Sequence, residues 1–432
     1  MAFKIGLLGL GTVGSGVAEI LGDRQGRQPL LQDVVLHRVG VRSLTKPRPV
    51  ALPPEVLTTD LAAIVQDPEV AMVVELIGGL EPARSLILQA IAQGKHIVTA
   101  NKAVIARHGD EIYTAANQAG VYVLLEAAVG GGIPIIQPLK QTLSVNRIQR
   151  VVGIINGTTN YILTAMSQAG ANFATVLAEA QQLGYAEADP TADVDGLDAA
   201  DKIAILASLA FGGRIRYEDI SCEGIRAVSA ADIRYAQELG FAIKLLAIAQ
   251  RDHHTQHHLQ VRVQPTLVPQ AHPLASVNGV FNAILVEGEP LGQVMFYGPG
   301  AGKGATASAV VADIANLVGL LKTSGSQGLH PLYSCAHQHY CEVAPIADLV
   351  TRFYTRFFCG DRPGVIGHIG TCFGQHEVSL ESIVQIDTQN DIAELVVVTH
   401  DVREGNFRQA LAEIRQLQAL DNITIESILR VL

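Results

Sequence analysis

The sequence predicts an α/β protein with a doubly wound parallel sheet first, a mixed α+β domain after it and a small β-α-β-β-α-β module last. Hydrophobic residues make up 48% and aromatic residues only 5% of the 432 residues, with Ala, Val, Ile and Leu dominating, as in parallel sheets covered by helices on both faces. Short apolar runs alternate with helical stretches up to about residue 135, whereas later runs alternate apolar with polar residues. A chain of this length suggests two or three domains.

The composition favours a soluble enzyme from a reducing compartment. The formal net charge is −10, so no electrostatic surface for nucleic acid is indicated. Glycines interrupt the apolar N-terminal run, and the apolar window at residues 121–138 contains Glu126. Neither a signal peptide nor a membrane span is therefore expected. The five cysteines are scattered and never in CxxC spacing, so neither a disulfide framework nor a zinc site is expected, and a cytoplasmic location fits.

The first expected element is a short apolar strand, followed by a glycine turn and an amphipathic helix, in FKIGLLGLGTVGSGVAEIL. Gly9, Gly11 and Gly14 have the spacing GxGxxG. Glycines at these positions permit the tight turn and the close approach of a pyrophosphate, and the helix N-terminus offers free N–H groups. The segment therefore predicts dinucleotide binding.

The second expected strand, VVLHRVGVR, ends at Arg42, where folds that select NAD usually place Asp or Glu. Ser43, Lys46 and Arg48 follow. Cationic groups here suit the 2′-phosphate of NADP, so NADP(H) is favoured over NAD(H). A solvated basic loop would have the same sequence.

Three further strands are expected at residues 72–79, 96–102 and 121–132, each ending in glycine or polar residues. Ligand-facing groups of such a sheet lie at the carboxyl ends of its strands, so Lys102 is expected at the binding crevice. A surface lysine at a helix N-terminus is the alternative.

From about residue 150 the pattern changes to a strand, a polar turn and a helix in VVGIINGTTNYIL. The turn at residues 156–160 either caps the helix or lines a ligand site. The segment at 298–318 repeats the glycine-loop and helix pattern, but Gly304 follows Lys303, so it is not an ATP-binding P-loop. The histidines of DHHTQHH, residues 252–258, are expected in a hairpin turn, because no carboxylate or cysteine pattern completes a metal site.

The acidic stretch GYAEADPTADVDGLDAADK, residues 184–202, is the strongest candidate for a substrate site. A calcium loop aligned on its Asp-Gly pair would begin at Thr191 and end at Lys202, so calcium binding fails. A solvated loop that caps the next helix is one alternative. The other is a site for an amino-bearing molecule, in which nearby carboxylates keep Lys202 protonated and able to donate to a developing charge.

Six motifs in this order resemble homoserine dehydrogenase over residues 1–340: GLGTVG, VTANK, EAAVGGGIP, INGTTNYIL, the acidic stretch and GPGAG. The segments DRPGVIGHIG and VSLESIVQ are similar to an ACT domain, an amino-acid-sensing module. The resemblance implies a Rossmann nucleotide-binding domain at 1–135, completed by 300–340, a catalytic and dimerisation domain at 136–300, and a ferredoxin-like ACT domain at 350–432.

The resemblance also implies an activity, the NAD(P)-dependent interconversion of L-homoserine and L-aspartate 4-semialdehyde on the route to threonine, methionine and isoleucine. It implies a homodimer or homotetramer, with no membrane partner. The ACT-like module implies inhibition by L-threonine, and a purely structural dimerisation module is the alternative.

By family motif, Lys202 is the proton donor and acceptor at the substrate oxygen, and Lys102 assists at the nicotinamide. The implied substrate-binding residues are Glu187, Asp198, Asp193, Thr158 and Gly184. The expected cofactor-binding residues are Gly9, Leu10, Gly11, Thr12, Val13, Gly14, Arg42, Ser43, Lys46, Gly78, Thr99, Lys102, Gly184, Gly300 and Gly302. The resemblance implies a sodium site made by Glu126 and the backbone of Val129, Gly131 and Ile133; a glycine-rich strand end is the alternative.

Two other functions remain open at this point. One is a different semialdehyde or hydroxy-acid dehydrogenase with the same sheet. The other is a regulator that senses NADPH and an amino acid. The two lysines favour an enzyme, because sensing requires neither of them.

Overall fold

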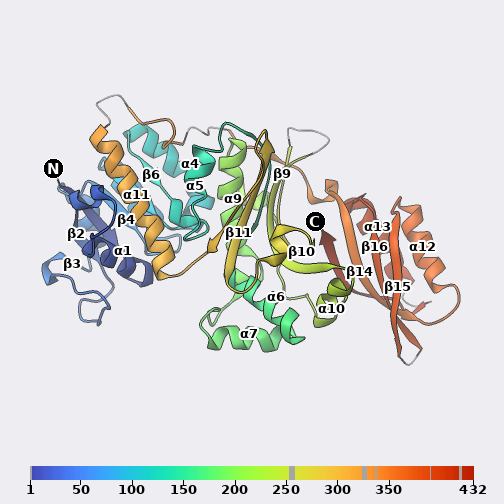
Figure 1. The fold of residues 1–432 in the computed structure, drawn as a ribbon. Helices are drawn as coiled ribbons and strands as arrows, with labels where there is room; N and C mark the ends of the chain where they lie inside the picture. The colour runs from blue at the N-terminus through green and yellow to red at the C-terminus, as the bar shows by residue number, and fades with distance from the viewer. Residues whose placement is uncertain are drawn as a thin grey trace. The chain divides into compact units, whose positions relative to one another are not determined.

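The computed structural model describes residues 2–252, 258–323, 328–335, 337, 339–389, 391–417 and 421–432 (Figure 1). The chain divides into two compact units. Unit 1 comprises Met1–Val151, Asp201–Tyr217 and Phe281–Cys341, and unit 2 comprises Val152–Ala200, Glu218–Val280 and Glu342–Leu432. All five cysteines of the chain are free thiols, as the sequence predicts.

Unit 1 is built on a parallel sheet in the order β3-β2-β1-β4-β5-β6. The strands are β1 (Phe3–Leu8), β2 (Val34–Gly40), β3 (Leu57–Thr58), β4 (Met72–Glu75), β5 (His96–Thr99) and β6 (Val123–Leu124). The order reverses beside β1, because the chain adds β2 and β3 on one side and then returns to add β4, β5 and β6 on the other. This confirms the predicted doubly wound sheet, whose strands are apolar because both faces are covered.

Helices α1 (Thr12–Gly22), α2 (Leu61–Gln66), α3 (Ala83–Ala92), α4 (Lys102–Ala119) and α5 (Ile136–Lys140) follow strands of this sheet or the turn after β6. Helix α11 (Lys303–Thr323) comes from a distant part of the chain and lies beside α1 in one hydrophobic cluster (Figure 1). A Cβ on Gly16 of α1 would lie only 2.8 Å from the Cβ of Ala307 in α11, so the two helices need glycine at this crossing.

Helix α11 is also long and apolar enough to cross a membrane by length and composition, with a mean hydropathy of 1.6. In the structure 56% of that window is buried inside unit 1, and Ile314, Leu317 and Val318 are completely buried. The helix is therefore part of the core of the sheet domain. The glycine-loop and helix pattern at residues 298–318 predicts a helix here, and the structure confirms it.

His96 in β5 is a partly buried histidine whose charge state links pH to the stability of unit 1. Its Nδ1 accepts the backbone N–H of Tyr122 at 3.1 Å, and burial lowers the pKa of His96 to about 4. Because this pKa lies below the ordinary 6.5, the unfolded chain takes up a proton at His96 before the folded chain does. The contribution of neutral His96 to stability is therefore complete above pH 6.5 and is lost as the pH falls towards 4. Lowering the pH from 7 to 5 should reduce the free energy of unfolding of both the native chain and His96→Gln. We predict that the reduction is about 1–2 kcal/mol larger in the native chain, because only that chain has the buried histidine. Urea unfolding of both proteins at the two pH values measures this, and equal losses would contradict it.

Unit 1 also contains the antiparallel hairpin of β11 (Phe281–Glu289) and β12 (Gly292–Pro299). Two elements, β7 (Arg147–Ile154) and α9 (Leu197–Phe211), run through the points where the chain passes from one unit to the other. The short strands β8 (Ser221–Cys222) and β13 (Glu342–Val343) belong to unit 2.

Unit 2 contains an antiparallel pair, β9 (Phe241–Arg251) and β10 (His258–Pro269). The expected histidine turn between them falls on residues 253–257, which lie outside the described residues. Its helices before the C-terminal module are α6 (Gly157–Ala169), α7 (Phe173–Gln182), α8 (Thr191–Val194) and α10 (Ala230–Glu238). Strands and helices are thus mixed here, as predicted for the second domain.

The C-terminal module of unit 2 has the predicted β-α-β-β-α-β order. Its elements are β14 (Val350–Gly360), α12 (Val365–Gln375), β15 (Leu380–Gln389), β16 (Ile392–Thr399), α13 (Glu404–Gln416) and β18 (Thr424–Val431), with a two-residue strand, β17 (Val402–Arg403), before α13. The last strand also pairs in parallel with β10, so a mixed sheet runs β9-β10-β18-β14-β16-β15 through unit 2. The module is therefore joined to the rest of unit 2 by backbone hydrogen bonds.

Candidate active site

A cavity of about 830 Å³ opens in unit 1 at the carboxyl ends of the parallel strands. Its lining includes Gly9 after β1, Arg42 after β2 and Gly78 after β4. Open α/β sheets bind ligands at this edge, beside the point where the strand order reverses. The cavity volume suits a cofactor-sized molecule.

The glycine turn after β1 shapes the floor of this cavity. Gly9 has a φ of +103°, and a Cβ there would lie 2.8 Å from the Leu76 carbonyl oxygen. A Cβ on Gly14 would lie 2.1 Å from the Gly9 carbonyl oxygen, whereas a Cβ on Gly11 would meet nothing within 4 Å. The first and last glycines therefore hold the turn together, and Gly11 leaves open space before α1. A pyrophosphate fits here, because the free N–H groups of a helix N-terminus face that space.

These different surroundings predict different effects of alanine at two of the glycines. We expect Gly14→Ala to destabilise unit 1 by about 1–3 kcal/mol, since its methyl group has to displace a backbone oxygen. Gly11→Ala should leave the melting temperature nearly unchanged but raise the KM for the nicotinamide cofactor about tenfold or more, since its methyl group occupies the ligand space. Thermal unfolding and cofactor titration of both variants test this. A larger loss of stability in Gly11→Ala than in Gly14→Ala would contradict it.

Basic side chains also line this cavity. They are Arg42, Lys46 and Arg48 of the loop after β2, together with Lys303 at the start of α11. Arg48 donates to the backbone carbonyl of Ser43, and this hydrogen bond fixes the loop. Ser43 also lines the cavity. Lys303 was not predicted as a cofactor residue. The second glycine loop, which precedes it, could have indicated that this residue lies at the cofactor.

Of the other expected cofactor residues, Leu10 and Thr12 line the cavity, whereas Val13, Gly14, Thr99, Lys102, Gly300 and Gly302 are not among its lining residues. Thr99 is fully buried. Its hydroxyl donates to Glu75 Oε2 at 2.6 Å and accepts the backbone N–H of Asn101 at 3.0 Å. Asn101 in turn caps α4 through the N–H of Val104. Thr99 therefore fixes the start of α4, where Lys102 is the first helical residue.

The glycine-rich segment after β6 forms a tight turn in unit 1. Gly130 and Gly131 have positive φ values of +73° and +52°, and a Cβ on Gly131 would lie 2.5 Å from the Gly300 carbonyl oxygen. The carboxylate of Glu126 accepts backbone N–H groups from the start of α5, at 2.7–2.9 Å. Burial raises the pKa of Glu126 in spite of these hydrogen bonds. Its carboxylate is thus committed to the helix start.

A second buried acid lies beside Glu126. Asp313 of α11 accepts the backbone N–H of Glu126 at 2.7 Å. Complete burial, with the nearby Glu126 carboxylate, raises the pKa of Asp313 to about 8. Asp313 was not predicted as a site residue, because its contact with Glu126 joins residues 187 positions apart in the chain.

In unit 2, Asn156 joins two of the predicted substrate-binding acids. Its Nδ2 donates to Asp193 Oδ1 at 2.7 Å and to Asp198 Oδ2 at 2.9 Å. Its Oδ1 accepts the backbone N–H of Thr159 at 2.8 Å and so caps α6. The predicted capping role is therefore confirmed. The amide bridge between the two carboxylates was not predicted, because it joins residues 37 and 42 positions apart in the chain.

Three other predicted substrate residues lie in or beside the loop after α7. Thr158 donates its hydroxyl to the carbonyl of Tyr185 at 2.7 Å, and Gly184 takes a φ of +77° at the end of the helix. Glu187 is exposed, and its carbonyl accepts Gln181 Nε2 at 3.0 Å. Thr158 therefore fastens the start of α6 to the loop that carries Gly184 and Glu187.

Helix α9 carries Asp198 in its first turn and Lys202 four residues later, so the two share a helix face one turn apart. Within unit 1, the neighbouring Asp201 pairs with Arg107 of α4 at 3.0 Å. The guanidinium of Arg107 also lies 4.3 Å from the ring centroid of Tyr217. The segment that holds Lys202 is thereby tied to the helix that begins at Lys102.

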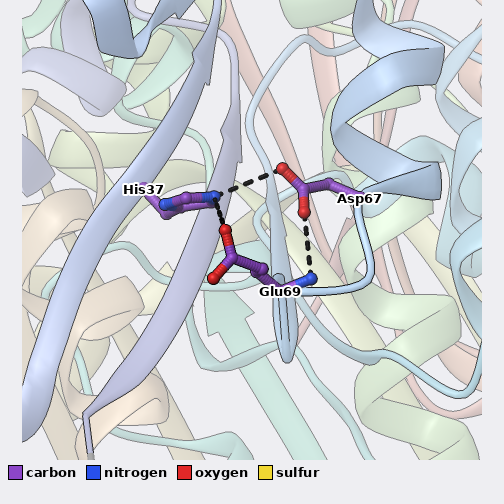
Figure 2. A group of neighbouring side chains, drawn as sticks. All are labelled: His37, Asp67 and Glu69. Atoms are coloured by element: carbon purple, nitrogen blue, oxygen red, sulfur yellow. Dashed lines mark hydrogen bonds and ion pairs between the residues drawn. The ribbon is translucent and has the colours of Figure 1, made fainter.

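A group that resembles a metal site lies elsewhere in unit 1. His37 Nε2 lies 3.2 Å from Asp67 Oδ2 and 3.5 Å from Glu69 Oε2 (Figure 2). However, Lys4 pairs with Glu69 and Arg38 pairs with Asp67. The two carboxylates are already neutralised by these cations, so the group is an ion-pair network that connects β1, β2 and the segment before β4.

Three family models match successive parts of the chain: the homoserine dehydrogenase NAD-binding domain at residues 9–126, homoserine dehydrogenase at 134–315 and the ACT domain at 353–419. The chain is 69% identical to a homoserine dehydrogenase of Synechocystis sp. over 100% of both chains. It is 40% identical to one of Bacillus subtilis, over 98% of this chain and 97% of that protein.

Solved structures agree with these relatives. A homoserine dehydrogenase from Thiobacillus denitrificans superimposes with a TM-score of 0.92 at 42% identity, covering 100% of this chain and 98% of that one. A hyperthermophilic archaeal homoserine dehydrogenase in complex with NADPH superimposes with a TM-score of 0.64 at 28% identity, covering 75% of this chain and 99% of that one. With the glycine turn and the nucleotide-sized cavity in place, the chain belongs to the homoserine dehydrogenase family of NAD(P)-dependent oxidoreductases and carries a C-terminal ACT domain.

Proposed function

We propose that this homoserine dehydrogenase prefers NADP(H) to NAD(H) and acts in the cytoplasmic synthesis of threonine, methionine and isoleucine. The observation that carries the cofactor preference is the basic lining of the nucleotide cavity by Arg42 and Lys46. A planar guanidinium favours the dianionic 2′-phosphate, which only NADP(H) carries. The relative that was solved in complex with NADPH is consistent with this preference.

The substrate is a four-carbon amino acid, so its ammonium needs carboxylates and its oxygen needs a proton donor. Asp198 and Asp193, held side by side by Asn156, with the exposed Glu187, bind the ammonium in this proposal. Thr158 and Gly184 complete the substrate site. A bound nicotinamide supplies the hydride chemistry.

Lys202 exchanges the proton at the substrate oxygen. In the reducing direction its ammonium protonates the oxygen as negative charge develops there, and in the oxidising direction the neutral amine takes the hydroxyl proton. Lys102, at the start of α4, assists by stabilising that oxygen and the carboxamide end of the cofactor.

The turn at residues 126–133 holds a sodium ion in this proposal. Because the Glu126 carboxylate already accepts three backbone N–H groups, the main-chain oxygens of Glu126, Val129, Gly131 and Ile133 supply the ligands. Hard monovalent cations prefer such oxygen donors. The ion would then stabilise the close contact between Gly131 and Gly300.

L-Threonine is the proposed effector of the ACT domain, and the enzyme is a homodimer or homotetramer. Inhibition requires that threonine and substrate bind with a coupling free energy. Light scattering of the full chain, with and without threonine, gives the oligomeric state.

Steady-state oxidation of homoserine by the full chain, with NADP and with NAD, and with and without threonine, tests the proposed function. We expect a lower KM for NADP than for NAD and inhibition by threonine. In Arg42→Ala the KM for NADP should rise about tenfold while the KM for NAD stays nearly unchanged. Equal changes for both cofactors would contradict the assignment of Arg42. Cofactor binding without homoserine oxidation would favour the sensory function instead, and activity only with other aldehydes would favour a different dehydrogenase.

A further inference from the structure

The C-terminal strand of the ACT domain, β18, carries a buried arginine near its end that is held by two carboxylates. Arg430 of β18 donates to both carboxylate oxygens of Glu223, at 2.7 and 2.8 Å. It also donates to both oxygens of Glu404 in α13, at 2.8 and 2.6 Å. Each pair is bidentate, which is the strongest arrangement of a guanidinium with a carboxylate.

The position of this arginine leaves it little freedom. Arg430 is 2% exposed and Glu404 is 0% exposed, so these two lie in the interior of unit 2, whereas the side chain of Glu223 is 40% exposed and lies at its edge. Arg408 also pairs with Glu404 and balances the second negative charge. Burial of the Glu223 carboxyl opposes its ionisation, but Arg430 and Arg408 outweigh that and hold the pKa of Glu223 below its usual value. Breaking one partner of such a buried cluster leaves an uncompensated charge.

Glu223 belongs to a segment, residues 222–226, that lies against the acidic stretch; we call this segment the brace. The backbone N–H of Ile225 donates to the Val194 carbonyl at 2.8 Å, and Cys222 Sγ donates to the Asp195 carbonyl at 3.3 Å. A Cβ on Gly224 would lie 2.2 Å from the Val194 carbonyl oxygen, so glycine is needed for this approach. The brace thus contacts the backbone immediately after Asp193.

A second attachment fixes the brace to the sheet. The backbone N–H of Glu223 donates to the Val263 carbonyl of β10 at 2.8 Å, and β10 pairs with β18 near Arg430 through Thr266. The side chain of Arg226 also pairs with Asp195. Movement of β18 would therefore be passed to the acidic stretch through the charged cluster and through the sheet.

We propose that Glu223 is a positioning residue, through which Arg430 and Glu404 of the ACT domain set the geometry of Asp193 and Asp198 in the substrate site. The inference rests on the proposed function, in which those two acids bind the substrate ammonium. Its consequence is that the ACT domain acts on substrate binding through residues 222–226 and not on the nucleotide cavity.

Kinetics of Glu223→Gln in the full chain tests this. The variant keeps the size of the side chain but removes the charge that holds Arg430. We expect the KM for homoserine to rise about 5- to 20-fold, with kcat and the KM for NADP within about twofold of the native values, because only the binding of substrate is disturbed. Arg430→Lys, which keeps the charge but loses the bidentate geometry, should shift the KM in the same direction by a smaller factor.

Tyr235→Phe is the matched control. The hydroxyl of Tyr235 in α10 donates to Glu394 of β16 at 2.6 Å. The variant therefore removes a hydrogen bond between α10 and the same ACT domain, and it leaves the hydrogen bonds of the brace unchanged. Its KM for homoserine should stay within about twofold of the native value. An equal rise in KM for the control, or an unchanged KM in Glu223→Gln, would overturn the proposal.

A double-mutant cycle of Glu223 and Arg430 tests whether the two residues act together, even if one variant is poorly stable. Glu223→Gln combined with Arg430→Lys should raise the KM no further than Glu223→Gln alone, since both break one link. Fully multiplicative effects would show that the two residues act independently and would also overturn the proposal. Failure of the proposed function is distinguishable, because the native chain itself would then not oxidise homoserine.

Discussion

Replacing Lys202 with alanine is expected to lower kcat for homoserine oxidation about 10²- to 10⁴-fold. The substrate oxygen loses its proton acceptor, while the nucleotide cavity, to whose lining Lys202 does not belong, is unchanged. The dissociation constant for NADPH should therefore stay the same. The rate of NADPH formation at saturating homoserine gives kcat, and fluorescence titration with NADPH gives the dissociation constant.

Lys322→Ala is the control for this variant. Lys322 lies in the last turn of α11 and pairs with Asp33 at the surface of unit 1. Loss of an exposed ion pair should change stability by less than about 1 kcal/mol and leave kcat unaltered. A native kcat in Lys202→Ala would exclude Lys202 as the proton-transfer group.

Replacing Asn156 with alanine is expected to lower the stability of unit 2 by about 2–4 kcal/mol and to raise the KM for homoserine more than about tenfold. The change removes the cap of α6 and the shared donor between Asp193 and Asp198. Asp198 is only 8% exposed, so its carboxylate loses a hydrogen bond that water replaces poorly. Without the amide, the two carboxylates also repel each other and separate.

A second helix cap separates the two roles of Asn156. Asn172 caps α7 by accepting the N–H of Thr175 at 3.0 Å, and it contacts neither acid. Asn172→Ala should therefore cost about 1 kcal/mol and leave the KM unchanged. Asn156→Asp keeps an oxygen for the cap but replaces the amide donor with a third negative charge, so it should raise the KM at least as much as alanine. Urea unfolding and steady-state kinetics measure both effects, and equal KM values for Asn156→Ala and Asn172→Ala would contradict the bridging role.

The order and type of the elements could be predicted from the sequence because they depend on local patterns. Apolar runs bounded by glycines indicated the parallel strands, and the alternating strands and helices after residue 350 indicated the C-terminal module. Helix α11 shows the limit of such patterns. Its apolar composition is the same in a core helix and in a membrane span, and its packing on α1 shows that it belongs to the core of unit 1.

The site was predictable to the extent that single motifs encode it. The glycine turn and the basic loop after β2 line the cavity because each is one continuous stretch of chain. The amide of Asn156, the buried acid Asp313 and the side chain of Lys303 were missed, since their roles come from contacts between distant segments. The hydrogen bonds of the Thr99 hydroxyl to Glu75 and Asn101 were not predicted either, and Thr99 at the cofactor stays a prediction. A polar residue at the end of a strand can therefore fix the start of the next helix as well as bind a cofactor.

A crystal structure of the full chain with NADP and homoserine bound would test the proposed role of Lys202. We expect the nucleotide phosphates at Gly11, the substrate ammonium at Asp193 and Asp198, and Lys202 Nζ within about 3.2 Å of the substrate hydroxyl. A complex in which Lys202 faces solvent, while another side chain contacts that hydroxyl, would exclude Lys202 as the proton-transfer group.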